Sequence, residues 1–179
     1  MGVHARAERI ALFLSVRYVP YATDGAPDRE TLMVFGRGDC LAKSACLISG
    51  FRALGYQAGR VRRLDHLPDQ PAEVWTLVSR EEDDHTAAEV LLEGQWRPVD
   101  ATHDPGLAAA GLVSARWDGL TDTAHEPKGP LWRPGDGPEP QPTAGVDEPD
   151  DAGGDLQGAF GRWLRAVRSD HAQAGPGGR

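Results

Sequence analysis

The chain has 179 residues, with 19 basic and 27 acidic side chains and a formal net charge of -8. This length suggests one domain with room for a tail, and 40% hydrophobic with 26% charged residues is a globular composition. The negative charge argues against a protein that coats nucleic acid or anionic lipid through charge alone, so neither nucleic acid nor a membrane is expected as a partner. Two cysteines are too few for a disulfide scaffold.

The N-terminal segment predicts a helix and a cytoplasmic location. Residues 5–18 have helical spacing of apolar side chains, and Pro20 ends the pattern. The apolar run at residues 10–16 is too short to cross a membrane, and no small-x-small cleavage site follows it. A cytoplasmic protein with reduced thiols is therefore expected. Residues 22–38 are rich in Gly and Pro and are expected to be mostly loop.

Residues 40–54 give the strongest helical pattern in the chain. Asp39 is placed to cap its N-terminus, and Gly55 is placed to stop it. Gly50 lies inside this helix, where Gly is about 1 kcal/mol less favourable than Ala. We therefore expect another segment to approach closely at Gly50.

The period then changes to two, which is typical of strands. Residues 57–64 and 74–78 are expected to be strands, and residues 85–92 and 95–100 flank the two-residue turn Glu93-Gly94, a hairpin signal. A helix followed by several antiparallel strands indicates the α+β class.

The C-terminal third separates into irregular sequence, a linker and a helix. Residues 1–132 are expected to form the domain, and residues 133–155, with one basic and seven acidic side chains, a disordered linker. Residues 156–179 carry four basic and one acidic side chain and predict an amphipathic helix, capped by Asp155, with a frayed tail. Its segment 156–168 is expected either to dock on the domain or to bind a partner protein.

Cys40 stands in the first turn of the clearest helix. The unpaired N–H groups and positive dipole of a helix N-terminus favour a thiolate there. The glycines of Gly36-Arg37-Gly38 would let backbone approach a substrate closely, and the Cys40 N–H is a natural oxyanion donor. A nucleophilic cysteine also needs a base and a group that orients the base.

The predicted hairpin supplies both groups. If Leu92 pairs with Gln95, His85 and Asp100 are diagonal neighbours on one face of the hairpin. Such neighbours lie about 7–8 Å apart at the backbone, within reach of an imidazole–carboxylate hydrogen bond. A turn of odd length would put the two side chains on opposite faces, so the inference depends on the turn.

These residues resemble a known family. The motifs are Gly38-Asp39-Cys40-x-x-Lys43-Ser44, Phe51-Arg52-Ala53-Leu54-Gly55-Tyr56-x-Ala58-x-Arg60, His85-Thr86-Ala87-x-Glu89-Val90 and Gly94-x-Trp96-x-x-Val99-Asp100-Ala101-Thr102. In this order they resemble the transglutaminase-like superfamily, a branch of the papain-like cysteine enzymes, over about residues 5–105. The segment from His103 to Trp132 is similar to an extension of bacterial, especially actinobacterial, members.

The resemblance implies a papain-like core in which a catalytic Cys begins a central helix packed on an antiparallel sheet carrying His and Asp. Cys40 would be the nucleophile, His85 the general base and acid, and Asp100 the residue that orients His85. The substrate would be a peptide, amide or thioester, with hydrolysis through an acyl-enzyme preferred and no cofactor. The alternatives are an amide-forming acyltransferase and a non-catalytic binding module. Upstream, only Val34 and Phe35 stand where the family has a second oxyanion donor, and neither side chain can donate.

Other candidate residues receive plainer interpretations. Cys46 lies about 240° around the helix from Cys40 and is expected in the core. Lys43 is expected to be structural, solvated or paired with Asp39 or with the acidic loop 81–84. Glu89 shares the His85 face and either supports the site or is a surface carboxylate.

A metal site and a nucleic-acid patch are not expected. The cysteines and His66, His85 and His103 lack the spacing of zinc ligands, so no metal is predicted. The basic run at residues 60–63 lacks interleaved aromatic residues and is interpreted as a solvated strand face. Trp96 is expected to pack, and Trp117 and Trp132 either wall a cleft or hold a loop against the domain.

Overall fold

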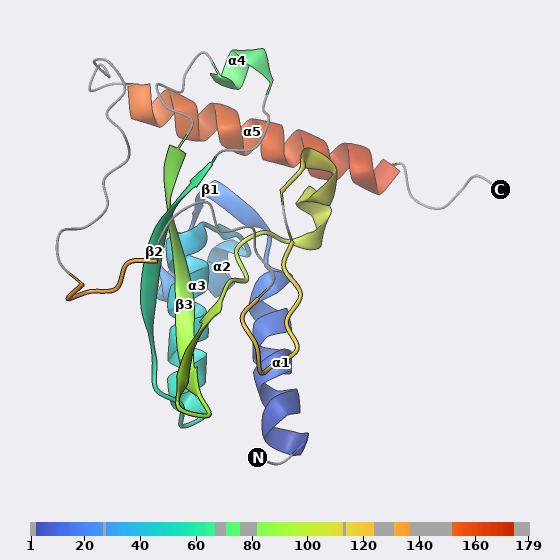
Figure 1. Cartoon of the computed structure of the whole chain (residues 1–179). Coiled ribbons are helices and arrows are strands. Elements are labelled where there is room, and N and C mark those ends of the chain that lie inside the picture. Colours follow the sequence, from blue (N-terminus) through green and yellow to red (C-terminus); the bar gives the residue numbers. More distant parts are fainter. Residues whose placement is uncertain are drawn as a thin grey trace.

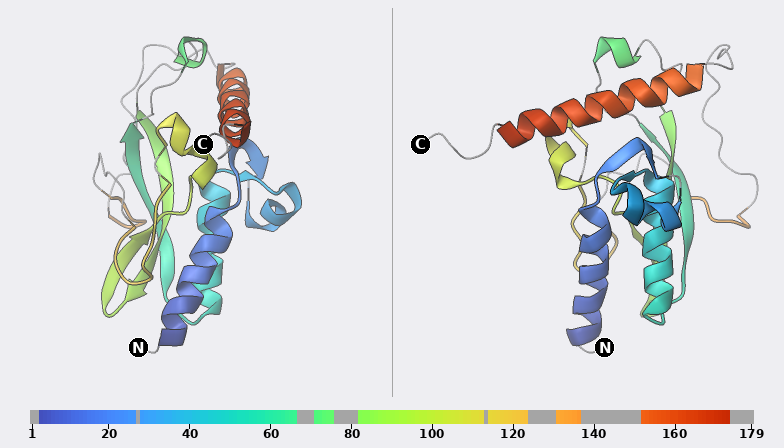
Figure 2. Two further views of the ribbon diagram at one scale, coloured as in Figure 1. Left: turned by 90° about the vertical axis from the view of Figure 1, so that its right-hand side faces the viewer. Right: turned by 180° about the vertical axis from the view of Figure 1, so that it is seen from behind.

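A computed structural model describes residues 3–26, 28–66, 71–75, 82–112, 114–123, 131–136 and 152–173. Strands β2 (Ala58–His66), β3 (Glu82–Leu92) and β4 (Gln95–Val99) form an antiparallel sheet in the order β2-β3-β4. Helices α1 (Val3–Arg17) and α3 (Cys40–Ala53) lie side by side against one face of this sheet (Figures 1 and 2). The predicted α+β class is confirmed.

The hairpin of β3 and β4 has the predicted register. Leu92 pairs with Gln95, and Glu93 and Gly94 form the turn with φ angles of 51° and 80°. Positive φ at both central residues is the type I′ geometry, whose twist matches that of the adjoining strands. The segment 82–84, expected to be part of an acidic loop, instead extends β3 and pairs with the end of β2.

The main core lies between the helices and the sheet. It consists of apolar side chains from α1, α3, all three strands and the loop after residue 112, namely Phe13, Val16, Leu47, Ile48, Phe51, Ala58, Ala88, Val90, Leu92, Val99, Ala101, Ala115 and Trp117. Trp117 packs against Phe13 and Phe51 with ring centroids 5.7 and 5.6 Å apart, so it holds its loop against the domain. Trp96, which follows the hairpin turn, is 40% exposed and is not among the residues of this core.

The close approach predicted at Gly50 is the crossing of α1 over α3. A Cβ atom added to Gly50 would lie 2.5 Å from the nearest Leu12 methyl carbon. The missing side chain therefore lets the two helices pack closely enough to share the core, which offsets the low helix propensity of glycine.

Two predicted segments differ from the structure. Strand β1 (Tyr21–Ala26) and helix α2 (Arg29–Phe35) occupy the stretch expected to be loop. Asp28 caps α2 by accepting from the Thr31 N–H at 2.9 Å, and β1 is held by backbone bridges to Gly38, a partner that no local pattern reveals. In place of the strand expected at 74–78, residues Ala72–Trp75 form the short helix α4, which starts directly after Pro71, and residues 76–78 lie outside the described residues.

The C-terminal helix α5 (Ala152–Gln173) docks on its own domain. It starts four residues before the predicted boundary, so Asp155 lies inside the helix instead of capping it. Phe160 and Leu164 of α5 form a second buried cluster with Val74, Leu107 and Leu112, beside the 3-10 helix η1 (Pro105–Ala110).

Figures 1 and 2 place α5 across the end of the sheet where β2 ends and β3 begins. Of the expected linker, residues 133–136 and 152–155 are ordered parts of a turn and of α5, and the remainder lies outside the described residues. The division into domain, linker and helix stays a prediction. Among the described helices, none is both long enough and apolar enough to span a bilayer.

Candidate functional site

Cys40 begins α3, as the sequence predicted. The Asp39 carboxylate accepts from the Ala42 N–H at 2.8 Å and so caps the helix that Cys40 starts. Cys40 is half-buried, and its side chain hydrogen bonds to His85.

Gly38 lies where a side chain would not fit, and the expected approach of its segment to a substrate stays a prediction. Its N–H donates to the Pro20 carbonyl at 3.1 Å, and an added Cβ would lie 2.4 Å from a Leu32 methyl carbon. The missing side chain therefore lets β1 and α2 pack against the start of α3.

His85 and Asp100 meet across the hairpin. His85 Nε2 lies 2.7 Å from Asp100 Oδ2, and the two residues are only 8% and 5% exposed. The structure thus brings Cys40, His85 and Asp100 together, in the order expected of a nucleophile, a base and an orienting carboxylate. Because Asp100 engages Nε2, Nδ1 is the ring nitrogen suited to exchange a proton with Cys40.

Asp100 is held by partners from three further segments. Its Oδ2 also accepts from Arg63 Nη2 at 3.1 Å, and its Oδ1 accepts from the Thr102 N–H at 2.9 Å. The Asp100 N–H donates to Thr123 Oγ1 at 3.1 Å. Every oxygen of the carboxylate is therefore engaged, and its orientation toward His85 is determined by the surrounding fold.

Arg63 is the site residue that the sequence interpretation missed. It was expected on a solvated strand face, yet it is 5% exposed and ion-paired with Asp100. Within the basic run only Arg60 is exposed, so the expectation of a solvated face is wrong for Arg63. The pairing of β2 with β3 sets Arg63 opposite His85. This position next to the site can be recognised only once the register of the two strands is known.

The electrostatics of the pair favour a charged His85. Burial alone lowers the pKa of His85, but the charge and hydrogen bond of Asp100 outweigh burial. The hydrogen bond and charge of Cys40 act in the same direction, and together these influences raise the pKa to about 10. At neutral pH the site therefore favours an imidazolium beside Asp100.

Lys43 lies one helical turn after Cys40 and is completely buried. Its Nζ donates to the carbonyls of Val19 and Thr102, each at 2.6 Å. A structural role was expected, but the expected partners, Asp39 or the acidic loop, are wrong because the side chain points into the domain. Burial lowers the pKa of Lys43 to about 7, against the opposing charges of Asp104 and Asp100.

The remaining candidates have partners elsewhere. Cys46 is partly buried against the core, as predicted, and burial raises the pKa of its thiol. Glu89 is buried and pairs with Arg133 at 2.7 Å, so it is not a surface carboxylate, and a supporting role at the site stays a prediction. The His103 ring lies 6.3 Å from the His85 ring and meets Tyr21 edge-on, so it lines the site.

The described segments give no support for a metal site or for a side-chain oxyanion donor. Within them, no three His, Cys, Asp or Glu side chains are grouped closely enough to hold a metal ion. The side chain of His66 lies outside the described residues. Val34 and Phe35, which stand where the family has its second oxyanion donor, are 83% and 56% exposed.

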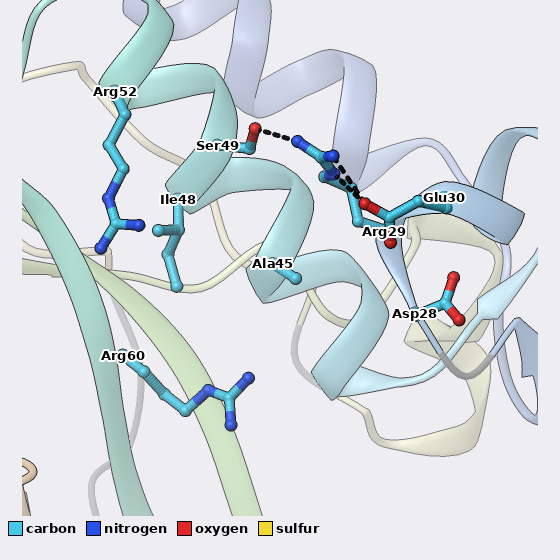
Figure 3. Close-up of a pocket in the computed structure, with 8 residues that line it drawn as sticks. All are labelled: Asp28, Arg29, Glu30, Ala45, Ile48, Ser49, Arg52 and Arg60. Atoms are coloured by element: carbon cyan, nitrogen blue, oxygen red, sulfur yellow. Dashed lines mark hydrogen bonds and ion pairs between the residues drawn. The ribbon is translucent and has the colours of Figure 1, made fainter.

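A hollow between α2, α3 and β2 lies apart from these residues (Figure 3). Its lining consists of Asp28, Arg29, Glu30, Ala45, Ile48, Ser49, Arg52 and Arg60. Arg29 binds Glu30 and Ser49, and Arg52 donates twice to the Ala58 carbonyl. None of Cys40, His85 and Asp100 lines this hollow, so it is separate from the candidate site.

Comparisons with known proteins identify a family and a similar solved structure. The family model of the transglutaminase-like superfamily matches residues 3–101. This range includes α1, α3, the sheet and Asp100. No curated protein matches the chain. Among solved structures, a protein of Cytophaga hutchinsonii described as a "Putative Cysteine Protease" matches at 20% identity with a TM-score of 0.42. That match covers 56% of this chain and 32% of the other, so the chain spans about a third of that protein's length. Because the family model matches more than half of the chain, the protein belongs to the transglutaminase-like superfamily.

Proposed function

We propose that the protein is a cysteine hydrolase that cleaves an amide or thioester bond through an acyl-enzyme on Cys40. Membership of the superfamily supports a cysteine-dependent enzyme in general terms. The observation that carries the finer proposal is the chain of contacts from the Cys40 side chain to His85 and from His85 Nε2 to Asp100 Oδ2 at 2.7 Å.

In the proposed mechanism, the Cys40 proton rests on His85 and the thiolate attacks the substrate carbonyl carbon. The raised pKa of His85 favours this imidazolium form, and Asp100 stabilises and orients it. The developing oxyanion is stabilised by the backbone N–H of Cys40 at the start of α3.

The Cys40–carbon bond that forms leaves a tetrahedral intermediate. His85 then donates its proton to the leaving amine or thiol, which departs as the carbon–nitrogen or carbon–sulfur bond breaks. In the second half, His85 accepts a proton from water, and the hydroxide displaces Cys40 to release the acid. An amine in place of water would give a new amide, so hydrolase and acyltransferase differ only in the acceptor.

The pair of cysteines on α3 provides a test with an internal control. We expect iodoacetamide to modify Cys40 rapidly at neutral pH, whereas Cys46, whose thiol pKa is raised by burial, reacts slowly at that pH. Peptide mass spectrometry after labelling at several pH values separates the two sites. Preferential labelling of Cys46 with an inert Cys40 would refute the mechanism.

Acyl transfer is tested with p-nitrophenyl acetate as a generic acyl donor. Wild-type protein should release nitrophenolate and carry an acetyl group on Cys40, whereas Cys40→Ala and His85→Asn should do neither. A Cys46→Ser variant should behave as wild type. Turnover in water alone supports the hydrolase, and turnover that needs an added primary amine supports the acyltransferase. A stable fold with no acylation of Cys40 would favour a binding module.

A further inference from the structure

Two cations, the buried Lys43 and the partly buried Arg168, hold together the segments on either side of the site. Lys43 donates to the carbonyls of Val19, just before β1, and Thr102, just after β4. The Tyr21 N–H donates to Asp104 Oδ2 at 2.9 Å, which joins the same two segments a second time. Backbone before β1 and backbone after β4 are therefore held side by side next to Cys40 and Asp100.

Arg168 of α5 closes this arrangement from outside. Its Nη2 donates to Asp104 Oδ2 at 2.6 Å and to the Tyr21 carbonyl at 2.5 Å, and its Nε approaches Asp104 Oδ1 at 3.3 Å. Asp104 is 5% exposed, and although burial raises its pKa, the hydrogen bonds from Arg168 and Tyr21 keep the pKa below its ordinary value. A bidentate guanidinium in such surroundings restricts both segments geometrically.

These contacts continue to the catalytic carboxylate. Thr102, which receives Lys43 on its carbonyl, donates its N–H to Asp100 Oδ1 at 2.9 Å. Asp104 follows two residues later and is the residue that Arg168 holds. A rotation or shift of residues 102–104 would therefore change the orientation of Asp100 toward His85.

We propose that Arg168 is a positioning residue for the Cys40–His85–Asp100 site, and that the C-terminal helix α5 is part of the catalytic unit through its contacts with Asp104 and Tyr21. This inference rests on the proposed function. The family match ends at residue 101, so both Asp104 and α5 lie beyond the matched family model. The role assigned to α5 is therefore a property of this chain rather than of that model.

The same helix offers a matched control. Arg165, three residues earlier, makes an ion pair with Asp24 of β1 at 2.6 Å, the same distance as the Arg168–Asp104 pair. Both ion pairs join α5 to the domain, and replacing either arginine by alanine removes one positive charge. The other ion pair of Asp24 is with Arg37, and the Asp24–Arg165 pair is more exposed than the Asp104–Arg168 pair. A role limited to docking the helix would therefore affect both variants alike.

The test compares Arg168→Ala with Arg165→Ala in the full chain carrying Cys46→Ser. The readout is the iodoacetamide labelling rate of Cys40 from about pH 5 to pH 9, with the unfolding midpoint measured for each variant. We expect Arg168→Ala to lower the rate near neutrality by on the order of tenfold and to move the profile to higher pH, because a small misplacement of Asp100 weakens the imidazolium. Arg165→Ala should keep the wild-type profile. Arg168→Lys, which retains the positive charge but loses the branched guanidinium donors, should have an intermediate labelling rate.

Equal profiles for Arg168→Ala and Arg165→Ala, or an unchanged profile for Arg168→Ala, would overturn the positioning role while the proposed function stands. An unreactive Cys40 in the wild-type chain would overturn the proposed function itself. Should Arg168→Ala fail to fold, Asp104→Asn removes the same ion pair with little change of shape. A wild-type profile for a folded Asp104→Asn would then refute the inference.

Discussion

His85 and Lys43 are both buried near Asp100, and their pKa values move in opposite directions. The folded pKa of His85, about 10, exceeds its ordinary 6.5, so its contribution to stability is complete below about pH 6.5 and is lost as pH rises toward 10. The folded pKa of Lys43, about 7, lies below its ordinary 10.5. The unfolded chain binds more protons at Lys43 between those values, so stability from this residue rises with pH.

Replacing one residue at a time should reveal how His85 and Lys43 each change the free energy of unfolding with pH. In Lys43→Met, the free energy of unfolding should fall between about pH 7 and pH 10, because only the His85 contribution remains. In Asp100→Asn it should rise over the same range, since the imidazolium has lost its carboxylate. Each change should be on the order of a few kcal/mol. Urea unfolding at several pH values measures both, and parallel pH dependences in the two variants would contradict these assignments.

At the scale of elements, the start of α3 depends on its cap. Asp39→Ala should lower the free energy of unfolding by about 1 kcal/mol, because the Ala42 N–H loses its partner, whereas Asp39→Asn keeps a cap oxygen and most of the stability. Asp28→Ala, which removes the equivalent cap of α2, is the control. Only Asp39→Ala should also slow iodoacetamide labelling of Cys40. Identical labelling rates of Cys40 in both variants would show that the Asp39 cap does not influence the site.

The hairpin turn contains a side chain in an unfavourable backbone conformation. Glu93 has a φ of 51°, a region that Asn and Gly adopt at lower cost than Glu. Glu93→Asn should therefore raise the free energy of unfolding by about 0.5 kcal/mol, and Gly94→Ala, at φ 80°, should lower it by about 1 kcal/mol. Thermal unfolding distinguishes the two signs. Stabilisation by Gly94→Ala would exclude the type I′ turn.

At the scale of the whole molecule, α5 shares a second core with η1 and α4. Leu164 is completely buried in that cluster, so Leu164→Ala should lower the free energy of unfolding by about 3 kcal/mol. Arg162→Ala, on the exposed side of the same helix, should change it by less than about 0.5 kcal/mol.

Hydrogen exchange then locates the loss. Amides of α5 and η1 should exchange faster in Leu164→Ala, whereas those of β3, packed in the main core, should change less. Equal acceleration throughout the chain would mean that the two clusters unfold as one unit. No acceleration in α5 would mean that the helix does not depend on this contact.

Features that depend on neighbours in sequence were predicted from the chain alone. The Asp39 cap, the start of α3 at Cys40 and the turn at Glu93-Gly94 each involve residues within a few positions of one another. The contact between His85 and Asp100 followed from the turn, because an antiparallel register propagates from a two-residue loop without further information. Local chemistry therefore determined the main helix, the hairpin and the contact between His85 and Asp100.

Features that depend on distant partners were decided only by the tertiary structure. Arg63 lies 37 residues from Asp100, Lys43 lies 59 from Thr102, and Arg168 lies 64 from Asp104. A charged side chain has the same local pattern whether it ends in water or beside a buried carboxylate, because its burial depends on which segments pack over it. The candidate site residues Cys40, His85 and Asp100 could thus be named from the sequence, whereas the ionic contacts around them arise from packing between strands, helix α3 and α5.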